Sequence, residues 1–181
     1  MNKQQLTKLS VEEKALLTSG RGAWHTHAVG DLPEIMMTDG PHGLRKQSDA
    51  PKGINDSNVA TCFPTSCAVA SSWNVQNAAE IARCIAEEAI AEDVSVVLGP
   101  GVNIKRSPLC GRNFEYYSED PLLAGEMASA YGSSMQQQGV GSCLKHFAVN
   151  EQETRRMTVD AIVDQRALRE IYLAAFEKVV K

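Results

Sequence analysis

The sequence predicts an α/β fold built around a parallel β-sheet. Three short apolar segments, residues 35–37, 94–98 and 140–149, alternate with patterns typical of amphipathic helices. The order strand, helix, strand, helix, strand, helix is that of right-handed βαβ units. Residues 94–98 are nearly all β-branched and do not alternate with polar residues, which is typical of a strand covered on both faces.

The composition indicates one globular domain. The 181 residues are 43% hydrophobic and 22% charged, and this length is enough to bury a core. The net charge is −4, with Lys and Arg scattered along the chain, so we expect no nucleic-acid partner. No run approaches the roughly 18 apolar residues of a membrane span, and the N-terminus lacks the apolar region of a signal peptide. We therefore expect a cytoplasmic location and no membrane contact.

Neither the cysteines nor the histidines suggest a metal site. The five cysteines are odd in number and lack zinc spacing, so we expect reduced thiols that serve as small apolar residues, with Cys143 in the core. His25 and His27 have no neighbouring third ligand. The segment LGPGVN lacks the full glycine fingerprint of a phosphate-binding loop. We expect no metal and no cofactor.

The N-terminal third contains one helix and one short strand. Ser10 and Glu13 form a capping-box pattern, so a helix should run from about residue 11 to 18 and stop near Gly20. The strand candidate 35–37 ends at Thr38-Asp39-Gly40-Pro41, which forces a turn, so that Asp39 projects from the strand end. Residues 47–61 are polar and aperiodic, and predict a mobile surface loop.

Three further helices follow. Residues 74–92 carry alanine and isoleucine at intervals of three and four, which is the clearest helical pattern in the chain. Asp120 and Pro121 make a good helix start, and that helix should stop at Gly139. Asp164 should cap a last helix. Its inward residues should be Leu168, Ile171, Tyr172, Ala175, Phe176 and Val179.

The long loop between residues 99 and 121 is the first candidate for a functional segment. Loops of more than about 12 residues in compact domains are uncommon and usually functional. This loop contains many groups that bind polar ligands, and it follows a strand, where α/β folds place their sites. A solvated surface loop is the competing interpretation, and the loop alone does not decide between them.

Ligand-type side chains stand at three strand ends: Asp39, Arg112 in the long loop, and Lys145 with His146. In a barrel these ends converge on one face. A carboxylate among cationic donors suits a sugar, because the carboxylate accepts hydrogen bonds from hydroxyls and the cations donate to hydroxyl oxygens. The same residues would equally suit a phosphorylated or carboxylate substrate.

Five motifs narrow the choice among these classes of substrate. They are EEKALLTSG, TDGPHGLRK, FPTSCAVASSWN, LGPGVNIKRSPLCGRNFEYYSEDP and GSCLKHFAVNEQETRR, and they span the chain from Leu6 onwards. In this order they resemble the N-terminal part of glycoside hydrolase family 3, and most closely its bacterial β-glucosidase branch. The resemblance implies a β-glucoside or a short β-linked oligosaccharide as the substrate.

The resemblance also implies a fold and a set of site residues. The fold would be the N-terminal portion of a (β/α)8 barrel, with residues 1–34 as a helix and lead-in and residues 35–181 as the first β/α units. Motif by motif, the sugar-binding residues would be Asp39, Arg112, Lys145, His146 and Arg156. Peptide bonds around the Lys-His pair can be cis in this family.

The family mechanism is retaining hydrolysis by two carboxylates. Its nucleophile is an aspartate in a Ser-Asp-Trp type motif and its acid/base lies in a following domain, and neither motif occurs here. A complete barrel needs roughly 250 residues. We therefore expect no catalytic residue in this chain and a nucleophile beyond Lys181. The chain would be a fragment that is inactive alone, with Glu115, Glu119, Glu151 and Glu153 acting as caps and loop hydrogen-bond partners.

Two interpretations of the function remain open. The chain is either the N-terminal piece of a β-glucosidase-type hydrolase or a non-catalytic carbohydrate-binding or remnant module. In both cases an incomplete barrel leaves sheet edges unpaired. We therefore expect association through these edges or with the missing C-terminal part.

Overall fold

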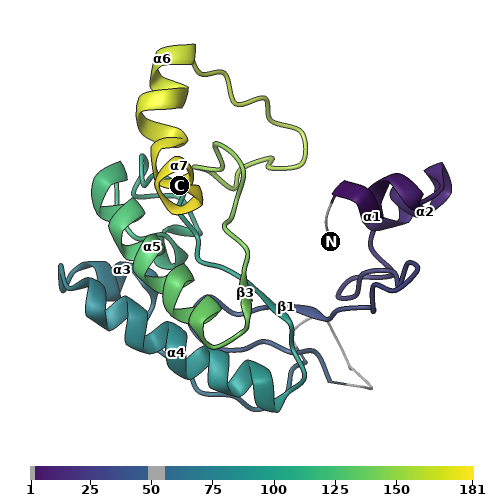
Figure 1. Cartoon of the computed structure of the whole chain (residues 1–181). Helices are drawn as coiled ribbons and strands as arrows, with labels where there is room; N and C mark the ends of the chain where they lie inside the picture. The colour runs from purple at the N-terminus through teal and green to yellow at the C-terminus, as the bar shows by residue number, and fades with distance from the viewer. Residues whose placement is uncertain (1–2, 49–55) are drawn as a thin grey trace.

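A parallel sheet lies at the centre of the computed structural model, which describes residues 3–48 and 56–181 (Figure 1). Among these residues it has three strands, β1 (Met37–Asp39), β2 (Val96–Leu98) and β3 (Gly141–Ser142), in the order β1-β2-β3. Met37 pairs with Val96, and Val96 pairs with Gly141. The predicted parallel α/β arrangement is confirmed, and the carboxyl ends of all three strands meet at one edge.

Three helices carry most of the packing. They are α4 (Val75–Ala91), α5 (Pro121–Gln137) and α7 (Ala174–Val180). α5 lies between the other two and contacts both (Figure 1). The Asn74 and Asp120 side chains cap α4 and α5 by accepting hydrogen bonds from the amides of Gln76 and Leu122, as N-cap residues do. Both helices run as predicted.

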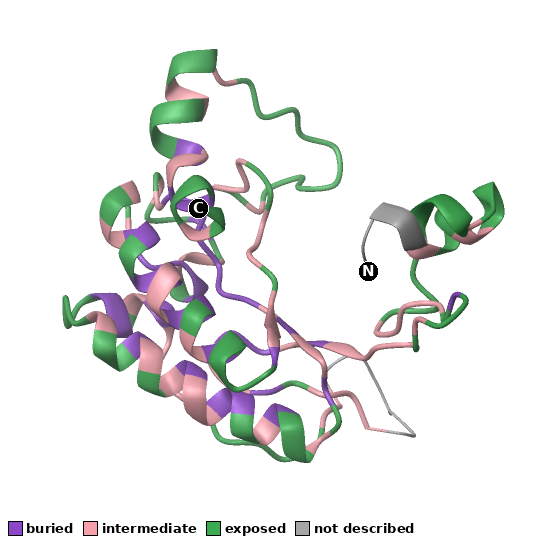
Figure 2. Cartoon of the chain, viewed as in Figure 1, coloured by how far each residue is buried: buried purple, intermediate pink, exposed green. Residues whose placement is uncertain are grey.

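The core lies where α4 and α5 meet the sheet (Figure 2). Small side chains bring the two helices close: Ala82 and Ala86 on α4 and Ala128 on α5 have no exposed surface. Val97 of β2 is also fully buried, but its neighbours Val96 and Leu98, whose side chains point to the opposite face, are only half-buried. The described residues therefore cover one face of β2 fully and the other only partly, although cover on both faces was predicted.

The N-terminal helices stand apart from this core. α1 (Lys3–Lys8) precedes α2 (Val11–Leu17), and the predicted capping box is formed, since Glu13 N donates to Ser10 Oγ and Ser10 N donates to Glu13. No residue of α2 is buried (Figure 2). Part of the loop predicted at 47–61 lies outside the described residues, and the Gln47 and Ser57 backbones that flank that part form a bridge.

All three strands differ from their predicted ranges, and β2 begins at Val96 rather than Val94. β1 begins at Met37 rather than Ile35, because Met36 instead bridges to His25 in the lead-in. β3 is limited to Gly141 and Ser142 of the predicted 140–149. Its partner strand β2 ends at Leu98 and is followed by Pro100, which has no N–H to continue the ladder.

Beyond β3 the chain still follows the β2 segment. Lys145 N donates to the Pro100 carbonyl (3.1 Å), and Val102 N donates to the Lys145 carbonyl (2.8 Å). The Lys145-His146 and Phe147-Ala148 peptide bonds are cis, as the family resemblance implied. The backbone thus passes Gly101 and Val102 closely without forming a regular strand.

The last predicted helix has three parts: α6 (Gln165–Ala167), a π-helical turn η2 (Leu168–Tyr172), and α7. Asp164 caps α6 as predicted, and Tyr172, Ala175 and Phe176 are buried. Ile171 is 39% exposed, so its predicted inward position is wrong. A π-turn adds one residue to the turn and rotates the residues around it away from the α-helical face. The remaining short elements are α3 (Ser66–Ala70) and the 3₁₀ turn η1 (Asn113–Glu115).

Candidate functional site

Asp39 and Lys145 meet at the carboxyl edge of the sheet. They are 106 positions apart, yet Lys145 Nζ lies 2.6 Å from Asp39 Oδ1. The strand register explains the contact, because Asp39 ends β1 beside Leu98 and Lys145 follows β3 on the other side of β2. Lys145 Nζ is also 3.6 Å from Glu115 Oε2, so one ammonium stands between two carboxylates.

The long loop returns to the same place through η1. Arg112 Nε donates to the buried Glu115 carboxylate, and its Nη2 is 2.7 Å from His146 Nε2. Gly101 makes this approach feasible. A Cβ at Gly101 would lie 2.9 Å from the Glu115 carbonyl oxygen and 2.9 Å from the Tyr116 ring. The loop and the strand end therefore touch through backbone at Gly101.

Arg156 joins the cluster at its outer edge. Its Nη1 is 3.0 Å from Glu153 Oε2, and Glu153 Oε1 is 3.8 Å from Arg112 Nε. The Arg156 side chain is 48% exposed, against 14% for Lys145. The structure thus brings all five sequence-predicted residues into one network of ion pairs and hydrogen bonds, hereafter the rim cluster: Asp39, Arg112, Lys145, His146 and Arg156, together with Glu115 and Glu153.

The electrostatics of the rim cluster are those of paired charges and a neutral histidine. Burial would raise the pKa of Asp39, but the nearby Lys145 and Arg45 outweigh it and hold that pKa below its usual range. Burial, together with the positive charges of Arg112 and Lys145, lowers the pKa of His146 to about 4. Burial raises the pKa of Tyr116 to about 12, so this phenol stays protonated.

Sequence reasoning missed three contributors to this site. One is Glu153, predicted as a cap or loop partner, which pairs with Arg156 and lies 3.8 Å from Arg112. Arg45 Nη1 is 3.2 Å from Asp39 Oδ2, and its position six residues after Asp39 in TDGPHGLRK was the available signal. Glu115 was predicted to act as a cap or loop partner, but it is buried and paired with Arg112 and Lys145. The buried carboxylate therefore belongs to the site itself.

Two other acidic residues of the loops, Glu119 and Glu151, lie outside the rim cluster. Glu151 fits the predicted role of a loop partner, since it accepts a hydrogen bond from Ile104 N (3.2 Å), and Glu119 is exposed. At the end of α7, the exposed Lys181 pairs with Glu177. The structure describes no residue after Lys181, so the expected position of the nucleophile stays a prediction.

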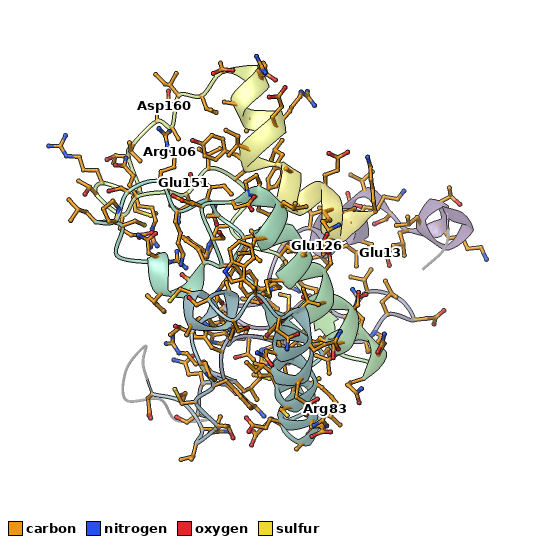
Figure 3. The ribbon with its side chains drawn as sticks, turned by 90° about the vertical axis from the view of Figure 1, so that its left-hand side faces the viewer. Glu13, Arg83, Arg106, Glu126, Glu151 and Asp160 are labelled. Carbon is orange, nitrogen blue, oxygen red and sulfur yellow. The ribbon has the colours of Figure 1, made fainter. Side chains whose placement is uncertain are left out.

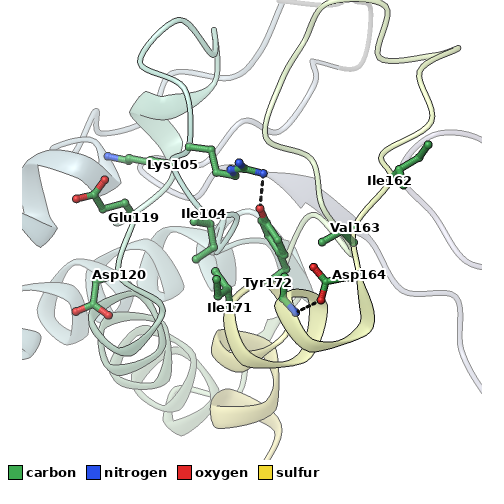
Figure 4. A pocket seen from close by; sticks show the side chains of 11 residues that line it. Ile104, Lys105, Glu119, Asp120, Ile162, Val163, Asp164, Ile171 and Tyr172 are labelled. Atoms are coloured by element: carbon green, nitrogen blue, oxygen red, sulfur yellow. Dashed lines mark hydrogen bonds between the residues drawn. The ribbon is translucent and has the colours of Figure 1, made fainter.

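A hollow of about 740 Å³ lies away from the rim cluster, between the long loop and α6 (Figure 4). Ile104, Ile171 and Tyr172 line it, and Arg106 Nη1 donates to the Tyr172 hydroxyl (2.8 Å). Figure 3 shows Arg106 near Glu151, far from Arg83 on α4. None of the five predicted residues lines this hollow.

Metal ligands, reactive thiols and membrane-spanning helices are the other features that would point to a function. Within residues 3–48 and 56–181 no three His, Cys, Asp or Glu side chains gather as metal ligands would, and His25 lies 3.7 Å from Glu34. The five cysteines are free thiols, but Cys143 is exposed, so its predicted place in the core is wrong. No helix in the described part of the chain has the length and apolar character to span a bilayer.

A parallel α/β sheet with charged side chains gathered at the carboxyl ends of its strands is the arrangement of TIM-barrel-like enzymes. The profile of the glycosyl hydrolase family 3 N terminal domain matches residues 27–181. This chain belongs to glycoside hydrolase family 3, and its fold is the TIM-barrel-like α/β fold of that family's N-terminal domain.

Curated relatives are similar over nearly the whole chain. Thermostable beta-glucosidase B of Acetivibrio thermocellus is 56% identical over 99% of this chain and 24% of that protein. An exo-alpha-(1->6)-L-arabinopyranosidase of Bifidobacterium longum is 54% identical over 96% of this chain and 24% of that protein. The chain therefore spans about a quarter of the length of these relatives.

Solved structures agree with this assignment. A family 3 beta-glucosidase of Bifidobacterium adolescentis superposes with a TM-score of 0.87 at 53% identity, covering 97% of this chain and 25% of that one. Beta-glucosidase 3B of Thermotoga neapolitana, solved in complex with α-D-glucose, gives a TM-score of 0.88 at 45% identity, covering 98% and 27%. Both solved structures therefore share the fold of this chain over nearly all of its length.

Proposed function

We propose that the rim cluster binds the terminal glycosyl residue of a β-glucoside or short β-linked oligosaccharide in a retaining β-glucosidase. The observation that supports this most strongly is the convergence of three side chains at one sheet edge. Lys145 pairs directly with Asp39, and Glu115 pairs with both Lys145 and Arg112. A solved relative bound to glucose supports the choice of sugar.

The chemistry of the network suits a polyol. The Asp39 carboxylate accepts hydrogen bonds from neighbouring hydroxyls, while Lys145 and Arg112 donate to hydroxyl oxygens, and charge-assisted hydrogen bonds are about twice as strong as neutral ones. Because each charge is already paired before a sugar arrives, its side chain is held in place and little conformational entropy is lost on binding. The exposed Arg156 would close the outer edge of the site.

We place the nucleophile and the acid/base beyond Lys181, outside these 181 residues. Asp39 has its pKa held low and is bound to Lys145, whereas a general acid needs a raised pKa. Burial raises the pKa of Glu151, but its Oε1 is bound to the Ile104 amide. The sequence also contains no Ser-Asp-Trp motif. These points favour a role in sugar binding for the carboxylates of this chain.

An aryl β-glucoside assay tests this placement. The purified 181-residue chain should release no aryl group above the buffer rate. Turnover that disappears on Glu115→Gln, Glu151→Gln or Glu153→Gln would place a catalytic carboxylate within the chain and contradict the proposal.

Calorimetric titration with D-glucose tests the binding role. Asp39→Asn should weaken binding at least about tenfold, because a charge-assisted hydrogen bond contributes about 1.5–3 kcal/mol. Asp160→Asn is the matched control, since Asp160 is exposed and lies outside the rim cluster. Equal losses in the two variants, or none in either, would refute the assignment.

The arabinopyranosidase relative supports a second candidate sugar. The test uses a longer protein that contains this chain. If that protein binds L-arabinose more tightly than D-glucose and cleaves aryl α-L-arabinopyranosides faster than β-glucosides, its activity is that of an arabinopyranosidase. Binding without hydrolysis by the entire protein would favour the alternative of a non-catalytic carbohydrate-binding module.

The remaining predictions stay open. β1 and β3 are edge strands of the described sheet, and we propose that association occurs through them or with a C-terminal part of the barrel. Light scattering of the purified chain tests this, and a sharply melting monomer would contradict it. The domain boundaries at residues 34 and 35 and the cytoplasmic location also remain predictions.

A further inference from the structure

The hydrogen bonds around His146 determine where its single ring proton lies. Arg112 Nη2 is 2.7 Å from His146 Nε2, and a guanidinium only donates. Nε2 must therefore accept, and cannot itself carry a proton. The imidazole is neutral near pH 7, because burial and the charges of Arg112 and Lys145 lower its pKa to about 4. The one proton then belongs to Nδ1.

Nδ1 faces the hydroxyl of Tyr116 at 3.2 Å. The Tyr116 side chain has no exposed surface, so its oxygen is fixed within the protein. Asn150 Nδ2 donates to the same oxygen (3.2 Å) and also to Glu153 Oε1 (3.2 Å), which links the phenol to the outer part of the rim cluster. The phenolic oxygen therefore accepts hydrogen bonds, and one of them comes from Nδ1–H.

The backbone of His146 is also fixed by hydrogen bonds. Asn103, which is 1% exposed, accepts from His146 N through Oδ1 (2.6 Å) and donates through Nδ2 to the His146 carbonyl (3.0 Å). With both backbone groups bound by one buried amide, the remaining freedom is rotation of the side chain. The Tyr116 hydroxyl and the Arg112 guanidinium restrict that rotation from opposite sides of the ring.

We propose that Tyr116 is a positioning residue of the sugar site: its hydroxyl accepts from Nδ1–H and holds the His146 ring in the orientation in which Nε2, already an acceptor, orients the Arg112 guanidinium. This rests on the proposed sugar-binding function of the rim cluster. It also revises the role predicted for His146, since an acceptor at Nε2 receives a hydrogen from Arg112 or from a sugar hydroxyl rather than donating one.

Nitrogen-15 spectra of histidine-labelled chain test the tautomer directly. The sequence has four histidines, and His146→Gln assigns the relevant signals. We expect a protonated Nδ1 and an unprotonated Nε2 at pH 7, with a nuclear Overhauser contact from the Nδ1 proton to the Tyr116 ring. A protonated Nε2, or a charged ring at pH 7, would overturn the proposal from the unmodified chain alone.

Tyr116→Phe tests the positioning role. It should lose the slowly exchanging Nδ1 proton signal and weaken D-glucose binding about tenfold, the loss expected for one hydrogen bond that orients a charged donor. The matched control is Tyr131→Phe, because the Tyr131 hydroxyl is buried without a partner among the described residues. That control should leave both readouts unchanged.

The outcomes separate the two proposals. A Tyr116→Phe chain that keeps the Nδ1 signal and full glucose affinity removes the positioning role while leaving the sugar site intact. Unmodified chain that binds no glucose refutes the proposed function, while its spectra still decide the tautomer.

Discussion

The α4–α5 interface and the rim cluster are both closely packed, but apolar side chains form the first and charged side chains form the second. The helix interface is formed by small and apolar side chains such as Ala82, Ala86 and Met127, all fully buried. The main polar link across it is Ser134 Oγ donating to the Ala79 carbonyl (2.7 Å). The rim cluster consists of paired charges, some of them nearly as buried, with Glu115 only 5% exposed.

The two regions should therefore contribute differently to stability and to function. Apolar burial contributes about 25 cal/mol per Å² of surface removed from water. Buried ion pairs gain little net stability, because the attraction between the charges is largely offset by the loss of hydration. The helix interface should stabilise the fold while the rim cluster recognises the ligand. Four substitutions or conditions test this division.

Lys145→Ala should have the largest effect. It leaves Asp39 and Glu115 as facing carboxylates without their shared cation, so we expect a loss of about 3 kcal/mol in unfolding free energy and about 100-fold in glucose affinity. Urea unfolding and calorimetric titration measure the two. Arg83→Ala removes an exposed helix-surface cation and should change neither. If both variants behaved alike, the rim cluster would have no special role.

Met127→Ala should affect stability only. Met127 is fully buried on α5, and truncation of such a side chain costs about 2–5 kcal/mol through lost burial and a residual cavity. Glucose affinity of the folded chain, measured well below the denaturation midpoint, should remain at the level of the unmodified chain. A parallel loss of affinity would show that the two regions are coupled.

Acid should weaken the fold through His146. Its pKa is about 4 in the folded chain and near 6.5 when unfolded, so between these values the unfolded state binds the extra proton and stability falls as the pH falls. Urea midpoints from about pH 7.5 to about pH 4.5 should therefore decline more steeply for the unmodified chain than for His146→Gln. His42, whose pKa burial also lowers, contributes in the same direction and is compared as His42→Gln. Identical slopes in all three chains would disprove this account.

Tyr131→Phe should have the smallest effect. Its hydroxyl is buried without a hydrogen-bond partner among the described residues, so removing it should leave stability unchanged or raise it by less than about 1 kcal/mol. Thermal unfolding followed by calorimetry measures the change. A clear destabilisation would indicate that the hydroxyl is bound in solution.

Local signals made most of the fold predictable from sequence. The alanine and isoleucine periodicity located α4, and the Asp120-Pro121 start located α5, to within a residue or two at most ends. The short strands were less well placed, because their ends depend on where a partner strand stops pairing. The limit of β3 depends on Pro100, more than 40 positions away in the chain.

The site was predictable only in part. Asp39, Lys145 and Arg112 were recognisable through strand ends and family motifs, and the structure brings them together. Glu115 was not, because an acidic residue in a loop next to tyrosines has the same local pattern whether it is exposed or buried. Its position depends on contacts with residues distant in the chain: its carbonyl oxygen lies close to Gly101, and its carboxylate pairs with Lys145. The tautomer of His146 likewise depends on the three-dimensional meeting of Arg112 and Tyr116.

Gly101 also limits how the site can be altered. Residue 101 has no room for even a methyl group, because a Cβ there would meet the Glu115 carbonyl oxygen and the Tyr116 ring. Directed evolution toward a different sugar would therefore find its tolerant positions at the exposed margin, at Arg45 and Arg156, while libraries that vary residue 101 should yield mostly clones that no longer bind a sugar.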